Sequence, residues 1–90
     1  MPLSPLPPEG TPLYHHPLPA LEEWLRQLGA RRQPDHPEVW DLQQPRWSAR
    51  IELETEELKV SWDQGQPPSV RHFPYGLSRA DVEAAILAGP

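Results

Sequence analysis

The feature that most constrains the fold is the stretch from Trp47 to Trp62, where apolar and polar side chains alternate. Successive side chains of a β-strand point to opposite faces of the sheet, so strict alternation gives one apolar face and one polar face. The stretch therefore predicts a β-hairpin with a turn near Thr55 to Leu58. The side chains expected on its apolar face are Trp47, Ala49, Ile51, Leu53, Leu58, Val60 and Trp62.

Charge decides among the registers that keep both apolar sets on one face. The register that we expect forms two opposite-charge pairs, each contributing roughly 0.2–1 kcal/mol. Its pairs are Leu53–Val60, Ile51–Trp62, Glu54–Lys59 and Arg50–Asp63. If one strand is shifted by two residues in one direction, Glu52 lies opposite Asp63, which is a like-charge pair. A shift by two residues in the other direction places Glu52 opposite Lys59 but loses the Arg50–Asp63 pair. On the other side of the hairpin, we expect Trp40 opposite Ala49.

The flanking segments predict helices and further strands around this hairpin. Leucines recur at helical spacing after Pro19, and Gly29 follows the last of them, which is typical of a helix end. Ser78 precedes a second helical segment as a good N-cap. The expected elements are a helix over 19–28, strands over 38–42, 47–55, 58–62 and 70–75, and a helix over 79–88. Residues 18–90 are thus predicted to form one α+β domain, with a two-layer arrangement of a three- to four-stranded antiparallel sheet and two helices packed on one face.

Residues 1–17 predict a proline-rich extended arm, because six of the fourteen prolines fall there. Such a segment favours the polyproline II conformation and continues neither a helix nor a sheet. We expect a semi-rigid tail whose part from Thr11 to Pro17 lies against the body through Leu13 and Tyr14. The alternative is a docking arm for an aromatic groove.

Composition excludes several classes of function. The net charge is −5 and the arginines are scattered along the sequence, so no basic stripe indicates binding to nucleic acid. The chain has no cysteine and no apolar run of the ~18 residues needed to span a bilayer. The first ten residues lack the pattern of a signal peptide. We therefore expect a cytoplasmic protein without a membrane span.

No constellation of residues in the sequence indicates catalysis. The glutamates around the hairpin turn are expected in solvent. Acid–base catalysis by a pair of carboxyl groups needs burial that raises the pKa of one of them, so we expect these glutamates to form a soluble surface. Neither the serines nor the five glycines form a nucleophile or phosphate-binding motif. We expect no metal site and no cofactor, because the histidines lack the spacing of zinc motifs. The alternative is a small metal-binding protein or enzyme that uses His15, His16 and His72.

The aromatic residues outside the hairpin predict a binding surface. An edge strand near residue 70 to 75 carries two aromatic side chains, and the arm brings a third with two histidines. Exposed strand edges and aromatic side chains both favour contacts with other proteins or between copies of one chain. The predicted partner-binding residues are Tyr14, His15, His16, Arg71, Phe73 and Tyr75.

Three phrases of the sequence resemble a small uncharacterised domain family found in cyanobacteria and plastid-bearing eukaryotes. They are TPLYHHPLPALEEWLRQLGA, WSARIELETEELKVSW and HFPYGLSRADVEAAILAGP, and the resemblance covers about residues 11–90. The proline-rich leader and the short loop at 64–69 depart from that family's pattern. The resemblance supplies no catalytic residues, and it implies a photosynthetic organism. We expect a non-catalytic protein-interaction module, an accessory or assembly factor for a photosynthetic or carbon-fixing complex.

Overall fold

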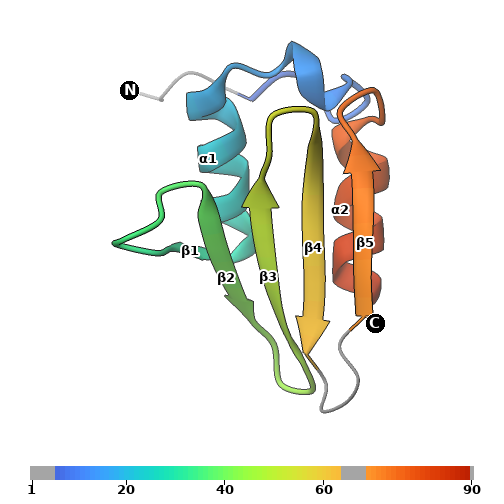
Figure 1. The fold of residues 1–90 in the computed structure, drawn as a ribbon. Helices are drawn as coiled ribbons and strands as arrows, with labels where there is room; N and C mark the ends of the chain where they lie inside the picture. The colour runs from blue at the N-terminus through green and yellow to red at the C-terminus, as the bar shows by residue number, and fades with distance from the viewer. Residues whose placement is uncertain (1–5, 64–68, 90) are drawn as a thin grey trace.

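The computed structural model describes residues 6–63 and 69–89. The first five residues of the predicted arm, the loop at 64–68 and Pro90 lie outside the described residues. Figure 1 shows a sheet with two helices on one side and the arm running across one end. In chain order the elements are η1 (Leu13–His15), α1 (Leu18–Leu28), β1 (Arg31–Arg32), β2 (Val39–Gln43), β3 (Ser48–Leu53), β4 (Glu57–Asp63), β5 (Ser69–Pro74) and α2 (Arg79–Ala88).

The sheet is antiparallel throughout and its strands lie in chain order, β1-β2-β3-β4-β5. The α+β class is confirmed, but the expected count of three to four strands is wrong, because the sheet has five. The additional strand is β1, where Arg31 pairs with Asp41 and Arg32 with Trp40. Both arginines are exposed, so the segment has no apolar alternation by which the sequence could indicate a strand.

The hairpin has the faces that its alternation predicts, but the expected register is wrong by two residues. The observed pairs are Ala49–Trp62, Ile51–Val60, Glu52–Lys59 and Leu53–Leu58, with Trp40 opposite Ile51 and Leu42 opposite Ala49. Two physical reasons account for the difference. The Glu54 amide donates to the Glu57 carbonyl at 3.0 Å, so Thr55 and Glu56 alone form a short hairpin loop. Arg50 pairs with Asp41 on β2 at 3.3 Å and does not need Asp63.

The core lies between the inner face of the sheet and the two helices. The largest fully buried side chains are three tryptophans, Trp24, Trp40 and Trp62. Two of them also form hydrogen bonds, one between the two helices and one between the sheet and α2. Trp24 Nε1 of α1 donates to Glu83 Oε1 of α2 at 2.8 Å, and Trp62 Nε1 donates to the Ile86 carbonyl at 3.2 Å. Strand β4 and the two helices are therefore fixed relative to one another.

Helix α1 buries only part of its leucine stripe. It ends at Gly29, whose φ of 100° is left-handed and suits glycine. Leu21 and Leu25 are buried in the core, whereas Leu18 in the first turn is 56% exposed. The start of α1 thus leaves an apolar side chain in solvent, next to the arm. No helix within residues 6–63 and 69–89 is long and apolar enough to cross a membrane.

Candidate functional site

The arm from Leu6 onward is part of the folded body, because its backbone bonds to the corner between β5 and α2. The arm supplies carbonyls to the first amides of α2, which have no partner inside the helix. Leu13 is fully buried and is the anchor that the sequence predicts, whereas Tyr14 is 63% exposed and is not buried as an anchor. The backbone hydrogen bonds are Leu13 N to Leu77 O and Tyr14 N to Tyr75 O, both 3.0 Å, Arg79 N to Thr11 O at 3.0 Å and Ala80 N to Glu9 O at 2.8 Å.

The buried polar group of the arm is His16, which is only 5% exposed. Its Nδ1 lies 3.1 Å from the carbonyl oxygen of Pro12. Since a carbonyl only accepts hydrogen bonds, Nδ1 carries the proton, and in the neutral ring Nε2 presents a lone pair. Nε2 is buried and has no hydrogen-bond partner among the described residues. An unpaired buried polar atom costs about 1–3 kcal/mol, so this nitrogen is a place where a ligand could gain a hydrogen bond.

A hollow of about 320 Å³ opens where the arm, the start of α1 and the β3–β4 turn meet. We call it the arm pocket. Most of its wall is leucine and tyrosine, and Tyr14 and Leu18 at its rim are the two most exposed large hydrophobic side chains of the described residues. The lining residues are Leu13, Tyr14, His16, Leu18, Leu21, Leu53, Glu54 and Tyr75.

Tyr75 closes the side of the arm pocket next to the β3–β4 turn. Its hydroxyl donates to the Glu54 carbonyl at 2.5 Å. Burial raises the pKa of Tyr75 above 10.0, and the negative charges of Glu54 and Glu57 raise it further. The phenol therefore stays neutral at physiological pH and remains a hydrogen-bond donor.

Comparison with known proteins identifies a family. Residues 28–89 match the family described as "Protein of unknown function (DUF3143)". The chain belongs to this family. No curated protein and no solved structure matches the sequence. The DUF3143 match contains Leu53, Glu54 and Tyr75 of the arm pocket, while η1 and all but the last residue of α1 lie before its first matched position.

The structure of this DUF3143 protein brings together only part of the predicted partner-binding set. Tyr14, His16 and Tyr75 line the arm pocket, and the exposed His15 ring lies 4.3 Å from the Tyr14 ring, centroid to centroid. Phe73, which was expected at the surface, is 3% exposed because it faces inward opposite Leu58. Phe73 and His16 are therefore corrected from surface contacts to buried residues.

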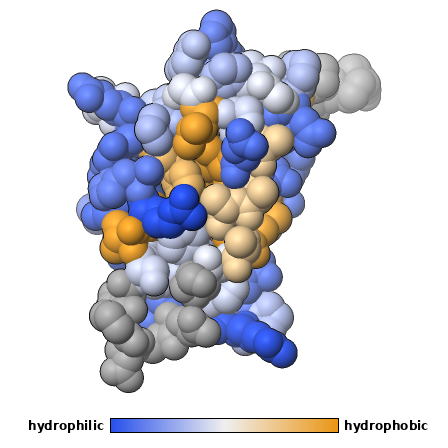
Figure 2. Space-filling view, turned by 90° about the vertical axis from the view of Figure 1, so that its right-hand side faces the viewer, coloured by the Kyte–Doolittle hydropathy of each residue, from blue (hydrophilic) through white to orange (hydrophobic). Residues whose placement is uncertain are grey.

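Arg71 lies outside the arm pocket, with its guanidinium 4.9 Å from the centroid of the Phe73 ring. Figure 2 faces the side of the molecule formed by β5 and α2 and shows an apolar strip there between hydrophilic side chains. The exposed large apolar residues of these segments are Val70 at 47%, Leu77 at 38% and Leu87 at 45%. This side is thus a second exposed apolar surface.

The three histidines of the metal-binding alternative do not form one cluster in the described part of the chain. His72 instead lies with Glu54 and Glu57, and the possible ligand atoms of these three residues are all within 4.8 Å of one another. His72 Nδ1 lies 2.5 Å from Glu57 Oε2. His15 and His16 are outside this cluster.

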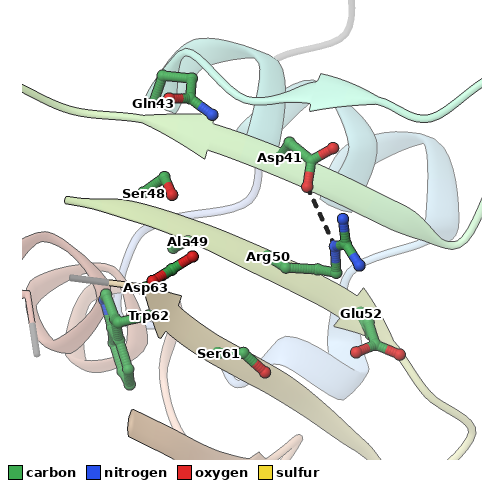
Figure 3. A pocket seen from close by; sticks show the side chains of 9 residues that line it. All are labelled: Asp41, Gln43, Ser48, Ala49, Arg50, Glu52, Ser61, Trp62 and Asp63. Atoms are coloured by element: carbon green, nitrogen blue, oxygen red, sulfur yellow. Dashed lines mark hydrogen bonds and ion pairs between the residues drawn. The ribbon is translucent and has the colours of Figure 1, made fainter. Parts of the chain in front are cut away.

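The outer face of the sheet carries a larger but polar hollow of about 460 Å³, drawn in Figure 3. Its central charges, Asp41 and Arg50, bond each other across β2 and β3. Ser48 and Ser61 also line it, but no histidine does, so neither serine has a general base within this lining. This surface therefore has the character of a solvated sheet face.

Sequence reasoning missed one clustering of basic residues. The guanidinium carbons of Arg26 and Arg32 lie 5.5 and 5.9 Å from the centroid of the Trp40 ring, so these arginines are not scattered in space. Each also lies near a carboxylate of α1, Glu23 at 3.4 Å and Glu22 at 3.5 Å. The cause is the antiparallel pairing of the short strand β1, which sets Arg32 opposite Trp40 and which no pattern in the sequence indicates.

Proposed function

We propose that this protein is a non-catalytic protein-interaction module and that the arm pocket holds an apolar side chain of a protein partner. The observation that carries the proposal is the combination of an apolar hollow with the buried, unpartnered Nε2 of His16. Binding sites are typically concave and mostly apolar, with a few polar groups that set the orientation of the ligand. The arm pocket has this composition at small scale.

The size of the arm pocket favours a side chain over a large cofactor. Pockets for drug-sized molecules measure roughly 300–1,000 Å³, and this hollow of about 320 Å³ lies at the lower limit. Full burial of one Leu, Met or Phe side chain contributes about 1.5–3 kcal/mol. Tyr14 and Leu18 at the rim would be covered by the same partner, and tyrosine is enriched among residues that dominate binding energy.

The polar groups at the arm pocket specify the chemistry of the partner. The lone pair on His16 Nε2 requires an N–H or O–H donor beside the apolar side chain. Glu54 at the pocket and Glu56 at the exposed loop tip, together with a net charge of −5, favour lysine or arginine on either side. The partner segment that fits is a large apolar residue flanked by basic residues.

The biological setting follows from the sequence resemblance rather than from the pocket. We propose that the family occurs in cyanobacteria and plastid-bearing eukaryotes and that the protein is cytoplasmic. We also propose that the protein is an accessory or assembly factor and that its partner belongs to a photosynthetic or carbon-fixing complex. The competing proposal, a small enzyme or metal-binding protein using His15, His16 and His72, is less favoured because His72 does not group with His15 and His16 among the described residues.

A displayed library of random peptides, selected on the immobilised full chain, tests the proposal while the partner is unidentified. We expect enriched peptides to share one large apolar residue with basic neighbours. Their binding should perturb amide resonances of His16, Leu18 and Tyr75. Enrichment of acidic peptides, or perturbations confined to β5 and α2, would overturn the proposal.

A matched pair of variants tests the same point by affinity. Leu18→Ser and Leu87→Ser each remove an exposed leucine from a helix, and the two side chains are 56% and 45% exposed. We expect Leu18→Ser to weaken a selected peptide about 10-fold or more, which corresponds to ~1.4 kcal/mol. Leu87→Ser should leave the affinity unchanged. Equal losses in both variants would contradict the assignment to the arm pocket.

Pairing between copies is a separate proposal for the edge of the sheet. The free edges are β1, with two residues, and β5, with six. Long free edges are templates for further strands, so we propose that any homo-oligomer forms through β5. Light scattering on a Val70→Lys variant tests it: an oligomer of the wild-type chain should become a monomer.

A further inference from the structure

The outer end of the β3–β4 hairpin gathers three metal-ligating side chains from separate segments. Glu54 precedes the hairpin loop, Glu57 begins β4, and His72 lies on β5. Their possible ligand atoms are within 4.8 Å of one another, and this is the only such group of three or more within residues 6–63 and 69–89. The hairpin turn and the pairing of β4 with β5 therefore bring these three side chains together.

The two glutamates oppose each other in a position where like charges are unfavourable. The Glu54 amide donates to the Glu57 carbonyl, so the two residues form the closing pair of the hairpin. Like charges directly opposite each other destabilise a strand pair. The single lysine of the sequence, Lys59, lies 3.9 Å from Glu52 and is opposite it in the sheet. The closing pair thus sets two carboxylates opposite each other, and the histidine of the group already contacts one of them, with His72 Nδ1 2.5 Å from Glu57 Oε2.

We propose that Glu54, Glu57 and His72 bind one divalent metal ion of the zinc type. An imidazole nitrogen with carboxylate oxygens suits Zn²⁺, whereas Ca²⁺ and Mg²⁺ take oxygen ligands. Three protein ligands leave a fourth position for water. Glu54 and His72 are exposed, so their side chains can rotate to close the ligand shell. The proposal replaces the three-histidine alternative and does not depend on the proposed function of the arm pocket.

His36 supplies a matched control for this site. It is exposed, and its Nδ1 lies 3.9 Å from Glu38 Oε2, so it is a surface histidine beside a carboxylate. The His36→Ala change removes an imidazole, as His72→Ala does. Among the described residues, however, His36 does not belong to a group of three possible metal ligands. Zinc bound by any exposed histidine would respond to His36 and His72 alike.

Calorimetric titration of the tag-free full chain with Zn²⁺ tests the proposal. We expect one ion per chain, with affinity reduced about 10-fold or more in His72→Ala and in Glu57→Gln, and unchanged in His36→Ala. Mg²⁺ should not compete. Absence of zinc binding, equal affinity in wild type and His72→Ala, or a loss in His36→Ala would overturn it.

A second measurement locates the ion and guards against misfolding of a variant. Co²⁺ added to the wild-type chain should broaden or shift amide resonances around Glu54, Glu57 and His72 before those around His36. Circular dichroism confirms that each variant is folded, and Glu54→Gln, at an exposed position, provides a further ligand removal if His72→Ala does not fold. Paramagnetic effects centred on the arm or on His36 would also overturn the proposal.

Discussion

The middle and the tip of the same β-hairpin differ in the burial and the pairing of their side chains. In the middle, Ala49, Ile51, Val60 and Trp62 are at most 4% exposed, and Trp62 Nε1 has a backbone acceptor. At the tip and the adjoining arm, two glutamates oppose each other, Tyr14 is exposed and His16 Nε2 is unpartnered. Sequences that specify a fold are consistent at every level except at functional positions. The contrast therefore places the stabilising contacts in the middle of the hairpin, and it supports the binding that we propose at its tip.

The largest effect is expected in the middle of the hairpin. Ile51→Ala should lower the free energy of unfolding by about 2–5 kcal/mol, because Ile51 is fully buried and the change leaves a cavity. Urea denaturation measures the loss. The control Ser61→Ala, on the outer face of β4, should change stability by no more than ~0.5 kcal/mol. A loss below about 1 kcal/mol for Ile51→Ala would mean that the middle is not the stabilising region.

The predictable part of the fold was the part governed by local periodicity. The alternation of apolar and polar residues identified the buried faces of β3 and β4. The sequence also predicted Ser78 as a helix N-cap, and the structure confirms it, because the Ser78 Oγ accepts a hydrogen bond from the Asp81 amide at 3.1 Å. The register was missed because Arg50 finds its partner on β2 rather than within the hairpin. Pair energies of a few tenths of a kcal/mol could not reveal which neighbouring strand supplies the opposite charge.

The next effect concerns the phenol that closes the arm pocket. Tyr75→Phe removes the hydrogen bond to the Glu54 carbonyl and should cost about 0.5–1.5 kcal/mol near neutral pH. The pKa of Tyr75 is raised above 10.0, so the unfolded state loses this proton first as pH increases. The stability of the wild type should therefore fall as pH rises above about 10, and this part of the fall should be absent in Tyr75→Phe.

Tyr14→Phe is the control for that pH profile. Tyr14 is 63% exposed. Removal of its hydroxyl group should therefore leave the stability at neutral pH, and the fall in stability at alkaline pH, close to those of the wild type. Denaturation curves collected between neutral and alkaline pH compare the two variants directly. A steep alkaline decline retained in Tyr75→Phe would show that another group controls it.

The candidate site was less predictable than the fold because long-range contacts build it. The sequence indicated the tyrosine and histidines of the arm, but not that His16 would be buried or that Glu54 would meet His72. Those facts depend on the arm crossing the β5–α2 corner and on β4 pairing with β5. No local pattern encodes either contact, whereas the grouping of Tyr14 with two histidines could be identified from sequence alone.

A smaller effect of opposite sign is expected at the closing pair of the hairpin. Glu54→Gln removes the repulsion with Glu57 and should raise stability by about 0.2–1 kcal/mol at low ionic strength, with the gain shrinking as salt is added. The pKa of Tyr75 should move down toward 10.0, as followed by ultraviolet absorbance of the phenolate. Glu56→Gln at the loop tip is the control. Equal gains in stability in both variants would refute a specific Glu54–Glu57 repulsion.

The smallest effect on stability is expected for His16→Leu, although this residue is buried. The change loses one hydrogen bond to Pro12, worth about 1 kcal/mol, and also removes the unpartnered Nε2, which costs about 1–3 kcal/mol. Urea denaturation should therefore give a change near zero or a slight gain. Binding of a selected peptide should nevertheless weaken, because its donor loses the nitrogen lone pair. A large loss of stability with unchanged peptide affinity would place His16 with the core of the hairpin and not with the binding surface.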